Sequence, residues 1–254
     1  MAQKKTIFSQ IFRFIRQHKH TIKTLAALGA GVAVCGAAIL LIWASTWRLP
    51  ALETIDSRKV SQSTKIYDRT GEVLLYDVFQ DIKRTVVPFE KISNNLKEAT
   101  LAIEDNKFYE HAGVRPLSFM RAVIANIFSL SFSQGGSTIT QQVVKNSLLV
   151  GDKKISRKLK EWVLALKLEK VRTKDEIFSM YLNEIPYGGN IYGAEEASQA
   201  FFGKTSENLT IAEAAYLAAI PKAPTFYSPY GKNKARLDAR KNLVIRKIYT
   251  NNST

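Results

Sequence analysis

The chain has 254 residues, of which 37 are basic and 22 acidic, giving a formal net charge of +15. This length suits one sizeable domain or two small ones, and a 46% share of hydrophobic residues is sufficient for a buried core. The single cysteine, Cys35, excludes an internal disulfide and a cysteine-based metal site, and the histidines, His18, His20 and His111, are too scattered for a metal cluster.

An apolar segment without any charged residue runs from Thr24 to Trp47. A bilayer core requires about 20 such residues, so the segment is long enough to cross it. A cleavable signal peptide is the alternative, but the apolar run is longer than a signal core and lacks a clean cleavage site. Only basic charges precede the segment: Lys4, Lys5, Arg13, Arg16, Lys19 and Lys23. The positive-inside rule therefore predicts a cytoplasmic N-terminus and an exported remainder.

We accordingly expect four parts in the chain. They are a basic cytoplasmic tail over residues 1–23, a transmembrane anchor over 24–47, a connector over 48–64 and a folded domain over 65–254. A basic exported domain beside a membrane favours an anionic partner, of which membrane lipids and lipid phosphates are the nearest. Nucleic acid is not expected on that side of the membrane.

The exported part begins with β structure and becomes helical from Ser93 onward. A hairpin is expected over 65–76 with its turn at Asp68–Gly71, and Thr85–Val87 is a further β-like run. Helices are expected over 116–130, from 137, over 156–171, from 173, over 212–220 and over 235–249.

Two of these helices begin with a recognisable cap. Thr173 and Thr210 are each followed three residues later by a glutamate, the pattern of a capping box. The helix over 156–171 is amphipathic, and its apolar stripe is expected to consist of Leu159, Trp162, Val163 and Leu166.

The first candidate site is an apolar helix that ends in Glu104 and Asp105, followed by Phe108, His111 and Gly113. A carboxylate at the mouth of an apolar helix is a candidate for proton transfer, because apolar walls exclude water and favour the protonated form. The alternative is an ordinary solvated helix end with a C-terminal glycine.

A second candidate site crowds polar side chains into the first turns of one helix. Hydroxyls, amides and a lysine lie together there: Ser137, Thr138, Gln141, Gln142 and Lys145. A helix N-terminus with such groups can cradle a phosphate. The alternative is a plain cap on a surface helix.

A third candidate site surrounds Glu161 with basic residues. Arg157 lies four residues before Glu161 and can pair with it across one turn. An exposed ion pair of this kind normally contributes little. Here, however, Lys153, Lys154, Lys158 and Lys160 are also near in sequence, so the cluster could grip a diphosphate. Tyr181-Leu-Asn-Glu-Ile185 is the fourth segment of interest.

In this order the four segments resemble the glycosyltransferase domain of peptidoglycan polymerases (glycosyltransferase family 51). That family comprises the monofunctional transglycosylases and the first catalytic domain of class A penicillin-binding proteins. The resemblance runs from about Lys65 to Ile248 and includes Ala215–Pro224. It implies a mainly α, lysozyme-like fold with a small β region at its start, preceded by a single transmembrane helix. The apolar helix over 116–130 would form a hydrophobic jaw against the outer leaflet.

The resemblance also implies a reaction, in which lipid II and a lipid-linked glycan react to form a β-1,4 bond with inversion and release of undecaprenyl diphosphate. Glu104 would act as the general base, and Glu161 would assist departure of the diphosphate, directly or through a divalent cation such as Mg²⁺; no organic cofactor is implied. The implied binding residues are Ser137, Thr138, Gln141, Gln142, Lys145, Arg157 and Lys158, and the implied supporting residues are Asp105, Phe108, His111, Gly113 and Asn183.

By the same resemblance the protein would sit in the bacterial cytoplasmic (inner) membrane as a single-pass protein with its catalytic domain on the periplasmic side. Other cell-wall synthesis, division or elongation proteins would be its partners. Two alternatives stay open: a lytic transglycosylase that cleaves glycan, and a non-catalytic scaffold. The chain has neither a Ser-x-x-Lys nor a Lys-Thr-Gly pattern, so no transpeptidase domain is expected. Its end at Thr254 suggests either a short monofunctional form or a C-terminally truncated fragment of a bifunctional protein.

Overall fold

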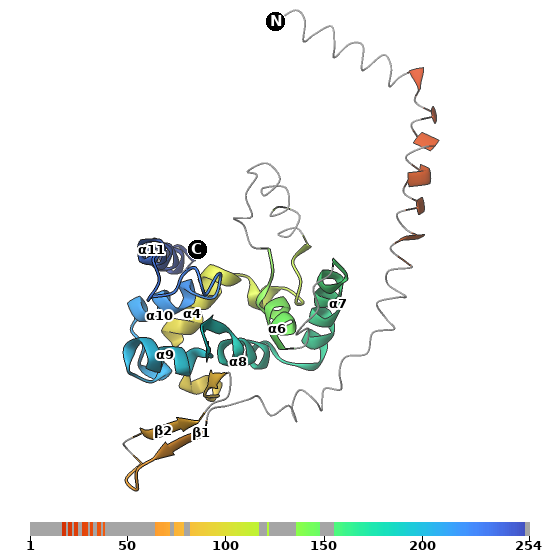
Figure 1. Ribbon diagram of the computed structural model, residues 1–254. Coiled ribbons are helices and arrows are strands. Elements are labelled where there is room, and N and C mark those ends of the chain that lie inside the picture. The colour runs from red at the N-terminus through yellow and green to blue at the C-terminus, as the bar shows by residue number, and fades with distance from the viewer. Residues whose placement is uncertain are drawn as a thin grey trace, which may run out of the picture. The chain divides into compact units, whose positions relative to one another are not determined.

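The computed structural model describes residues 64–71, 74–78, 82–116, 121, 136–147 and 155–251, together with scattered residues between 17 and 38 (Figure 1). The chain divides into two units, Met1–Arg48 and Leu49–Thr254. Among the described residues, no helix has both the length and the apolar character that crossing a membrane requires. The predicted anchor over 24–47 lies largely outside the described residues, and so does the predicted jaw helix over 116–130, apart from Pro116 and Arg121.

The second unit is mainly helical in the part that the structure describes. Its α-helices are α4 (Asn94–Glu104), α6 (Ile139–Ser147), α7 (Ile155–Val171), α8 (Lys174–Glu184), α9 (Ala194–Phe202), α10 (Ile211–Ala219) and α11 (Lys234–Asn251). Short 3-10 helices cover Phe89–Lys91, Phe108–Glu110 and Ser206–Asn208. Helices α4, α10 and α11 pack against one another, and α6 packs against both α7 and α8 (Figure 1).

Two small sheets accompany the helices. Strands β1 (Thr64–Tyr67) and β2 (Leu74–Val78) form an antiparallel hairpin, and the N–H of Gly71 donates to the carbonyl of Asp68 at 3.0 Å. The other sheet has the order β3-β5-β4, with β3 (Lys83–Arg84) parallel to β5 (Ile191–Tyr192) and β4 (Pro186–Gly188) antiparallel to β5. The predicted hairpin and the mainly α character with a small β region are confirmed.

The expected strand over Thr85–Val87 is wrong, because β3 ends at Arg84. The reason lies in a side chain from another part of the chain. Asn183 accepts a hydrogen bond from the N–H of Val87 at 3.0 Å and donates to the carbonyl of Val87 at 3.1 Å. The amide side chain therefore occupies the positions that a neighbouring strand would take.

Both predicted capping boxes are present. The Thr173 hydroxyl accepts from the N–H of Glu176 while the glutamate side chain accepts from the N–H of Thr173, and Thr210 pairs with Glu213 in the same way. In each capping box the side chains accept hydrogen bonds from N–H groups at the helix start that would otherwise lack a partner. Such a cap is worth about 1 kcal/mol of stability.

The predicted apolar stripe of α7 is wrong in part. Leu159 and Leu166 are 41% and 40% exposed, whereas Leu164, Ala165 and Leu168 are buried. The buried stripe also includes Glu161, which is 3% exposed. Because a carboxylate lies on the buried face, hydrophobic periodicity alone points to the wrong side of the helix.

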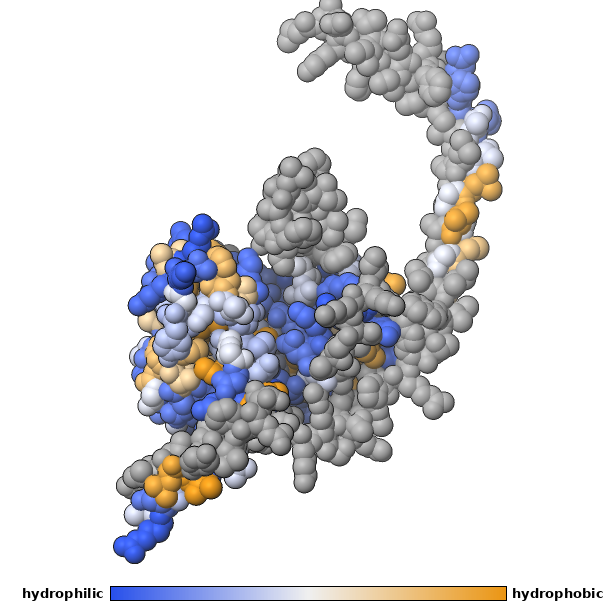
Figure 2. Space-filling model, in the orientation of Figure 1, coloured by the Kyte–Doolittle hydropathy of each residue, from blue (hydrophilic) through white to orange (hydrophobic). Residues whose placement is uncertain are grey.

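The core of the second unit lies between these helices. Its largest fully buried side chains include Leu96, Phe108, Phe178 and Leu217, and each such burial contributes about 1.5–3 kcal/mol. The β1–β2 hairpin, in contrast, leaves Ile66 and Leu75 exposed. Figure 2 shows hydrophobic surface, in orange, on this hairpin. The core fixes the relative positions of α4, α6, α7 and α11, whose polar faces form the candidate site.

Candidate active site

The end of α4 places Glu104 beside the core. Ser93 caps this helix by accepting from the N–H of Leu96 at 3.2 Å, and the buried face of the helix contains Ala99 and Ala102. Glu104 is its last residue, and its side chain is 13% exposed. The helix thus delivers a carboxylate from an apolar face to the edge of the core.

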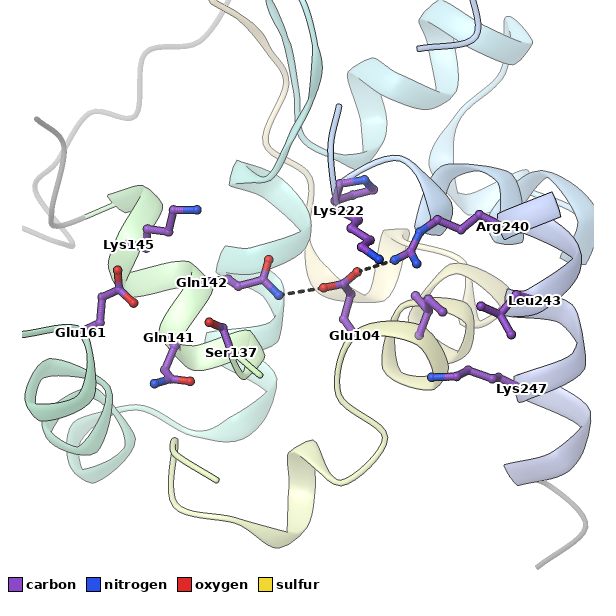
Figure 3. A pocket seen from close by; sticks show the side chains of 12 residues that line it. Glu104, Ser137, Gln141, Gln142, Lys145, Glu161, Lys222, Arg240, Leu243 and Lys247 are labelled. Carbon is purple, nitrogen blue, oxygen red and sulfur yellow. Dashed lines mark hydrogen bonds and ion pairs between the residues drawn. The ribbon is translucent and has the colours of Figure 1, made fainter. Parts of the chain in front are cut away.

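Both carboxylate oxygens of Glu104 have a partner (Figure 3). Gln142 donates from Nε2 to Oε2 at 2.8 Å, and Arg240 donates from an Nη atom to Oε1 at 3.3 Å. The three side chains come from α4, α6 and α11. The orientation of the Glu104 carboxylate is therefore set by two other helices.

Directly after Glu104, the buried Asp105 accepts three hydrogen bonds. They come from His111 Nε2 at 2.9 Å, from Arg115 Nη1 at 3.2 Å and from the backbone N–H of Ile139 at 3.2 Å. His111 Nδ1 accepts from the N–H of Gly113, so the ring proton is on Nε2 and points at Asp105. Asp105 thereby ties the loop after α4 to the first turn of α6.

Phe108 and Gly113 shape the same loop. The Phe108 ring is buried 5.7 Å from that of Phe178, and the ammonium of Lys174 lies 4.4 Å from the centre of the Phe108 ring. Gly113 has φ +84°, and a Cβ there would lie 2.8 Å from Glu169 Cγ. Phe108 therefore packs on α8, and Gly113 packs on α7.

At the start of α6, Thr138 and Gln141 are joined by hydrogen bonds. The N–H of Thr138 donates to Gln141 Oε1 at 2.9 Å, and the N–H of Gln141 donates to Thr138 Oγ1 at 3.2 Å. The Thr138 hydroxyl also donates to the carbonyl of Gly113 at 2.6 Å. Both side chains are almost fully buried, so these contacts hold the helix start in place. Their assignment as binding residues stays a prediction.

Lys145 lies one turn after Gln141 on α6, and unlike Thr138 and Gln141 it is not buried. Its side chain is exposed and makes no hydrogen bond or ion pair with any residue that the structure describes. Lys145 and Gln142 both line one cavity, and Figure 3 shows both side chains projecting from α6. An ammonium in this position is available to an anion.

The buried Glu161 on α7 faces two cations. Lys158 Nζ lies 2.7 Å from Oε2, and Arg157 Nε lies 3.4 Å from Oε1. Lys158 also donates to Ser137 Oγ at 2.8 Å, which links α7 to the segment before α6. The predicted pairing of Arg157 with Glu161 is present, and Lys158 is the closer partner.

One cavity of about 560 Å³ brings most of these side chains together (Figure 3). It contains both Glu104 and Glu161. Its other lining residues are Ile103, Ser137, Gln141, Gln142, Lys145, Pro221, Lys222, Arg240, Leu243 and Lys247. Four basic side chains therefore line the cavity against two carboxylates, and each carboxylate already has a cationic partner. This excess of positive charge suits a ligand with at least two negative charges.

Sequence reasoning missed three of these cations, namely Lys222, Arg240 and Lys247. Burial is the main cause that lowers the pKa of Lys222 and of Lys247, and the nearby Arg240 lowers both further while Glu104 opposes the shift. Arg240, Leu243 and Lys247 are three and four residues apart, the spacing of one helix face, and this spacing was the available signal.

Asn183 does not line the cavity. It is 4% exposed, and its hydrogen bonds go to the backbone of Val87 and to the carbonyl of Ser179. Nearby, burial and the charge of Glu104 raise the pKa of Tyr181, whose hydroxyl finds no hydrogen-bond partner among the described residues. Asn183 thus fixes the segment after β3, at a distance from the predicted chemistry.

The surroundings of Glu161 do not suit a divalent cation held by protein side chains alone. Both of its oxygens face cations, and a bound metal ion would have to displace them. Within the part of the chain that the structure describes, no three His, Cys, Asp or Glu side chains are grouped closely enough to hold a metal ion. Such ions prefer several oxygen ligands, which Glu161 alone does not supply.

The sequence matches the family described as Transglycosylase over residues 71–249. It is 39% identical over 217 residues to penicillin-binding protein 1A of Rickettsia bellii, covering 84% of this chain and 27% of that protein. It is 40% identical over 200 residues to penicillin-binding protein 1A of Aquifex aeolicus, covering 79% of this chain and 27% of the relative.

A third relative, penicillin-binding protein 1A/1B of Bacillus subtilis, is 40% identical over 228 residues, or 89% of this chain and 24% of that protein. The chain thus spans about a quarter of the length of these relatives. The crystal structure of penicillin-binding protein 1A from Haemophilus influenzae matches with a TM-score of 0.40 and 24% identity, covering 75% of this chain and 18% of that chain.

Proposed function

The chain belongs to the transglycosylase family, and from that membership we propose that it is a peptidoglycan glycosyltransferase. It joins lipid II to a lipid-linked glycan through β-1,4 bonds, with inversion, and releases undecaprenyl diphosphate. The observation that carries the proposal is the cavity in which Glu104 and Glu161 lie among an excess of basic side chains. Deprotonation of the attacking sugar hydroxyl requires a general base, and cations stabilise the negative charge of the leaving diphosphate.

Glu104 is the general base in this reaction. Its carboxylate removes the proton from the 4-hydroxyl of the acceptor GlcNAc as that oxygen attacks C1 of the donor MurNAc, and the bond from C1 to the diphosphate breaks. Gln142 and Arg240 hold the carboxylate in one orientation, which supports a directed proton transfer. General-base catalysis of this kind is typically worth about 10²–10⁴ in rate.

The basic side chains stabilise the departing diphosphate. Lys145 lines the cavity and forms no hydrogen bond or ion pair with any described residue, while Arg157 and Lys158 form ion pairs with Glu161. Fixed charges aimed at a leaving group lower the barrier because they need no reorganisation during the reaction. No step of this scheme passes through a metal ion.

Two alternative functions receive less support. A lytic transglycosylase cleaves glycan and has no diphosphate to bind, so the cations around the cavity favour synthesis. A non-catalytic scaffold has no need of a carboxylate that two other helices hold in place.

The proposal extends to the membrane. The uncharged segment Thr24–Trp47 anchors the chain as a single helix in the bacterial inner membrane, and the basic residues before it keep the N-terminus in the cytoplasm. The lysozyme-like domain, with the jaw over 116–130, then works at the outer leaflet, where lipid II is its substrate and other cell-wall synthesis proteins are its neighbours.

Polymerisation of fluorescent lipid II by the detergent-purified full chain tests the function. A ladder of glycan strands on a gel is expected. If no ladder forms but isolated peptidoglycan releases anhydro-sugars, the protein is a lytic enzyme. If a folded protein does neither, the scaffold alternative holds.

Removing the charge of Lys145 should weaken diphosphate binding. We expect Lys145→Ala to lower the affinity for inorganic pyrophosphate about 10- to 100-fold, because a hydrogen bond to a charged group is worth about 1.5–3 kcal/mol. Calorimetric titration measures this change. Lys170→Ala, which removes an exposed charge of α7 outside the cavity lining, is the matched control. Equal affinities in the two variants would refute a diphosphate contact at Lys145.

Two lysines of the cavity lining, Lys222 and Lys247, should give the same binding a pH dependence. Because the pKa values of Lys222 and Lys247 are lowered, these groups lose charge at a lower pH than an ordinary lysine, whose pKa is about 10.4. Pyrophosphate affinity should therefore already fall as the pH rises toward that ordinary lysine value. The double variant Lys222→Arg/Lys247→Arg keeps both charges and should retain its affinity over this range. A fall of the same size in both proteins would contradict the assignment.

A further inference from the structure

The loop that joins α10 to α11 begins at the cavity wall and carries two exposed aromatic rings. Pro221 and Lys222 at the start of this loop line the cavity itself. A few residues further on, Phe226 is 43% exposed and Tyr230 is 79% exposed. A single exposed aromatic residue is common, but these two occur in one short loop that continues from the cavity wall.

Phe226 connects to Glu104 through an unbroken series of contacts. Its ring meets that of Tyr227 edge to face, with centroids 5.0 Å apart and planes at 89°. The Tyr227 ring lies 5.6 Å from the guanidinium of Arg240, which in turn pairs with Glu104. The exposed ring is thus two contacts away from a side chain of the cavity.

Tyr230 is exposed, but its hydroxyl and its ring each have a partner on α9. Its hydroxyl donates to the carbonyl of Ala200 at 3.4 Å, and its ring lies 6.0 Å from that of Phe201 on α9. Elsewhere in the loop the N–H of Tyr227 donates to the carbonyl of Ala223 at 2.9 Å. Rings fixed in this way lose little freedom when a ligand covers them, so the contact area is not offset by a large ordering cost.

We propose that Phe226 and Tyr230 form an aromatic platform on which sugar rings of a glycan strand stack while one end of the strand occupies the cavity. Sugar rings with equatorial substituents present a face of C–H groups, and such a face packs on the electron-rich face of an aromatic ring. A cavity of about 560 Å³ holds a ligand of drug size, so a polymer must continue over the surface. The inference rests on the proposed function, because that function supplies a polymeric ligand.

Binding of the strand on the platform should increase the length of the glycan product. A strand that is held on the platform after one addition stays near the cavity and is extended again before it dissociates. Loss of the two rings therefore shortens the strands. Two other occupants, an apolar protein segment and a lipid surface, would also cover aromatic rings, and the experiments separate them from a glycan.

The first experiment measures binding of a neutral β-1,4-linked N-acetylglucosamine hexamer to the full chain in detergent. Phe226→Ala/Tyr230→Ala should lose affinity about tenfold, whereas Phe226→Tyr/Tyr230→Phe, which keeps both rings, should bind within about twofold of the unchanged protein. Tyr67→Ala removes an exposed ring from the β1–β2 hairpin and is the matched control. Equal hexamer affinity in the double alanine variant and the Tyr67 control would overturn the proposal, and so would a lack of hexamer binding by the unchanged protein.

The second experiment separates this inference from the proposed function. In the lipid II assay, the double alanine variant should give shorter strands, and the double aromatic variant should give strands of unchanged length. If the unchanged chain makes no strands but binds the hexamer in a ring-dependent way, the polymerase proposal fails and the platform stands. If strands form with unchanged length and the double alanine variant instead loses binding to phospholipid vesicles, the platform serves a lipid surface and the inference is wrong.

Discussion

Replacing Glu104 with glutamine should lower the polymerisation rate about 10²- to 10⁴-fold, which is the usual contribution of a general base. Glutamine has the same shape but does not accept a proton at working pH. The fold should tolerate the change, because Gln142 can turn its amide and present its oxygen to the new donor, while Arg240 still faces an acceptor. Diphosphate binding should be unchanged or tighter, since one negative charge leaves the cavity.

The measurement is the initial rate of lipid II consumption at saturating substrate, together with pyrophosphate affinity for the same protein. Glu98→Gln is the matched control, because Glu98 is an exposed residue of the same helix, outside the cavity lining. A Glu104→Gln protein with unchanged turnover would disprove the base assignment. A protein that loses pyrophosphate affinity along with its rate would point to a role in binding instead.

Short-range features of the fold were predictable from the sequence. The capping boxes at Thr173 and Thr210 depend on residues three apart, and the turn at Asp68–Gly71 depends on four consecutive residues. Such features depend on contacts between residues close in sequence, so local patterns identify them. The expected strand over Thr85–Val87 failed because its partner is Asn183, and no local pattern reports a contact with so distant a residue.

The candidate site was predictable only where its residues lie in compact motifs. Glu104, Gln142, Lys145 and Glu161 line one cavity, as expected of motifs from one site. Arg240 pairs with Glu104 although 136 positions separate them, and α11 carries other basic residues that do not line the cavity. The sequence offers several basic helix faces, and only the packing of α11 against α4 selects one of them.

The prediction of the apolar stripe on α7 was wrong in part because a carboxylate lies on the buried face. Glu161 lies on the buried face with Leu164 and Leu168, while two leucines remain exposed. A buried carboxylate lowers the apparent hydrophobicity of the face that packs inward, and it is tolerated because Lys158 and Arg157 pair with it. Departures from hydrophobic patterning of this kind are expected where a chain places functional groups.

Replacing Gly113 with alanine should strongly destabilise the loop behind Glu104. The residue has φ +84°, and an added Cβ would lie 2.8 Å from Glu169 Cγ and 2.9 Å from the carbonyl oxygen of Ala165. A left-handed conformation costs a non-glycine residue about 1–2 kcal/mol, and overpacking adds about 1–3 kcal/mol. We therefore expect the free energy of unfolding to fall by about 2–5 kcal/mol, measured by urea denaturation of the full chain in detergent.

Gly71→Ala separates the two causes. Gly71 has φ +77°, but an added Cβ meets nothing within 4 Å, so this variant should show the conformational cost alone. The excess loss in Gly113→Ala then measures how closely the loop packs on α7. That packing bears on catalysis, because the carbonyl of Gly113 accepts from Thr138 and its N–H donates to His111, which in turn bonds Asp105. Equal losses in the two variants would mean that the loop yields to a methyl group, and the support inferred for Glu104 would then be weaker than these contacts indicate.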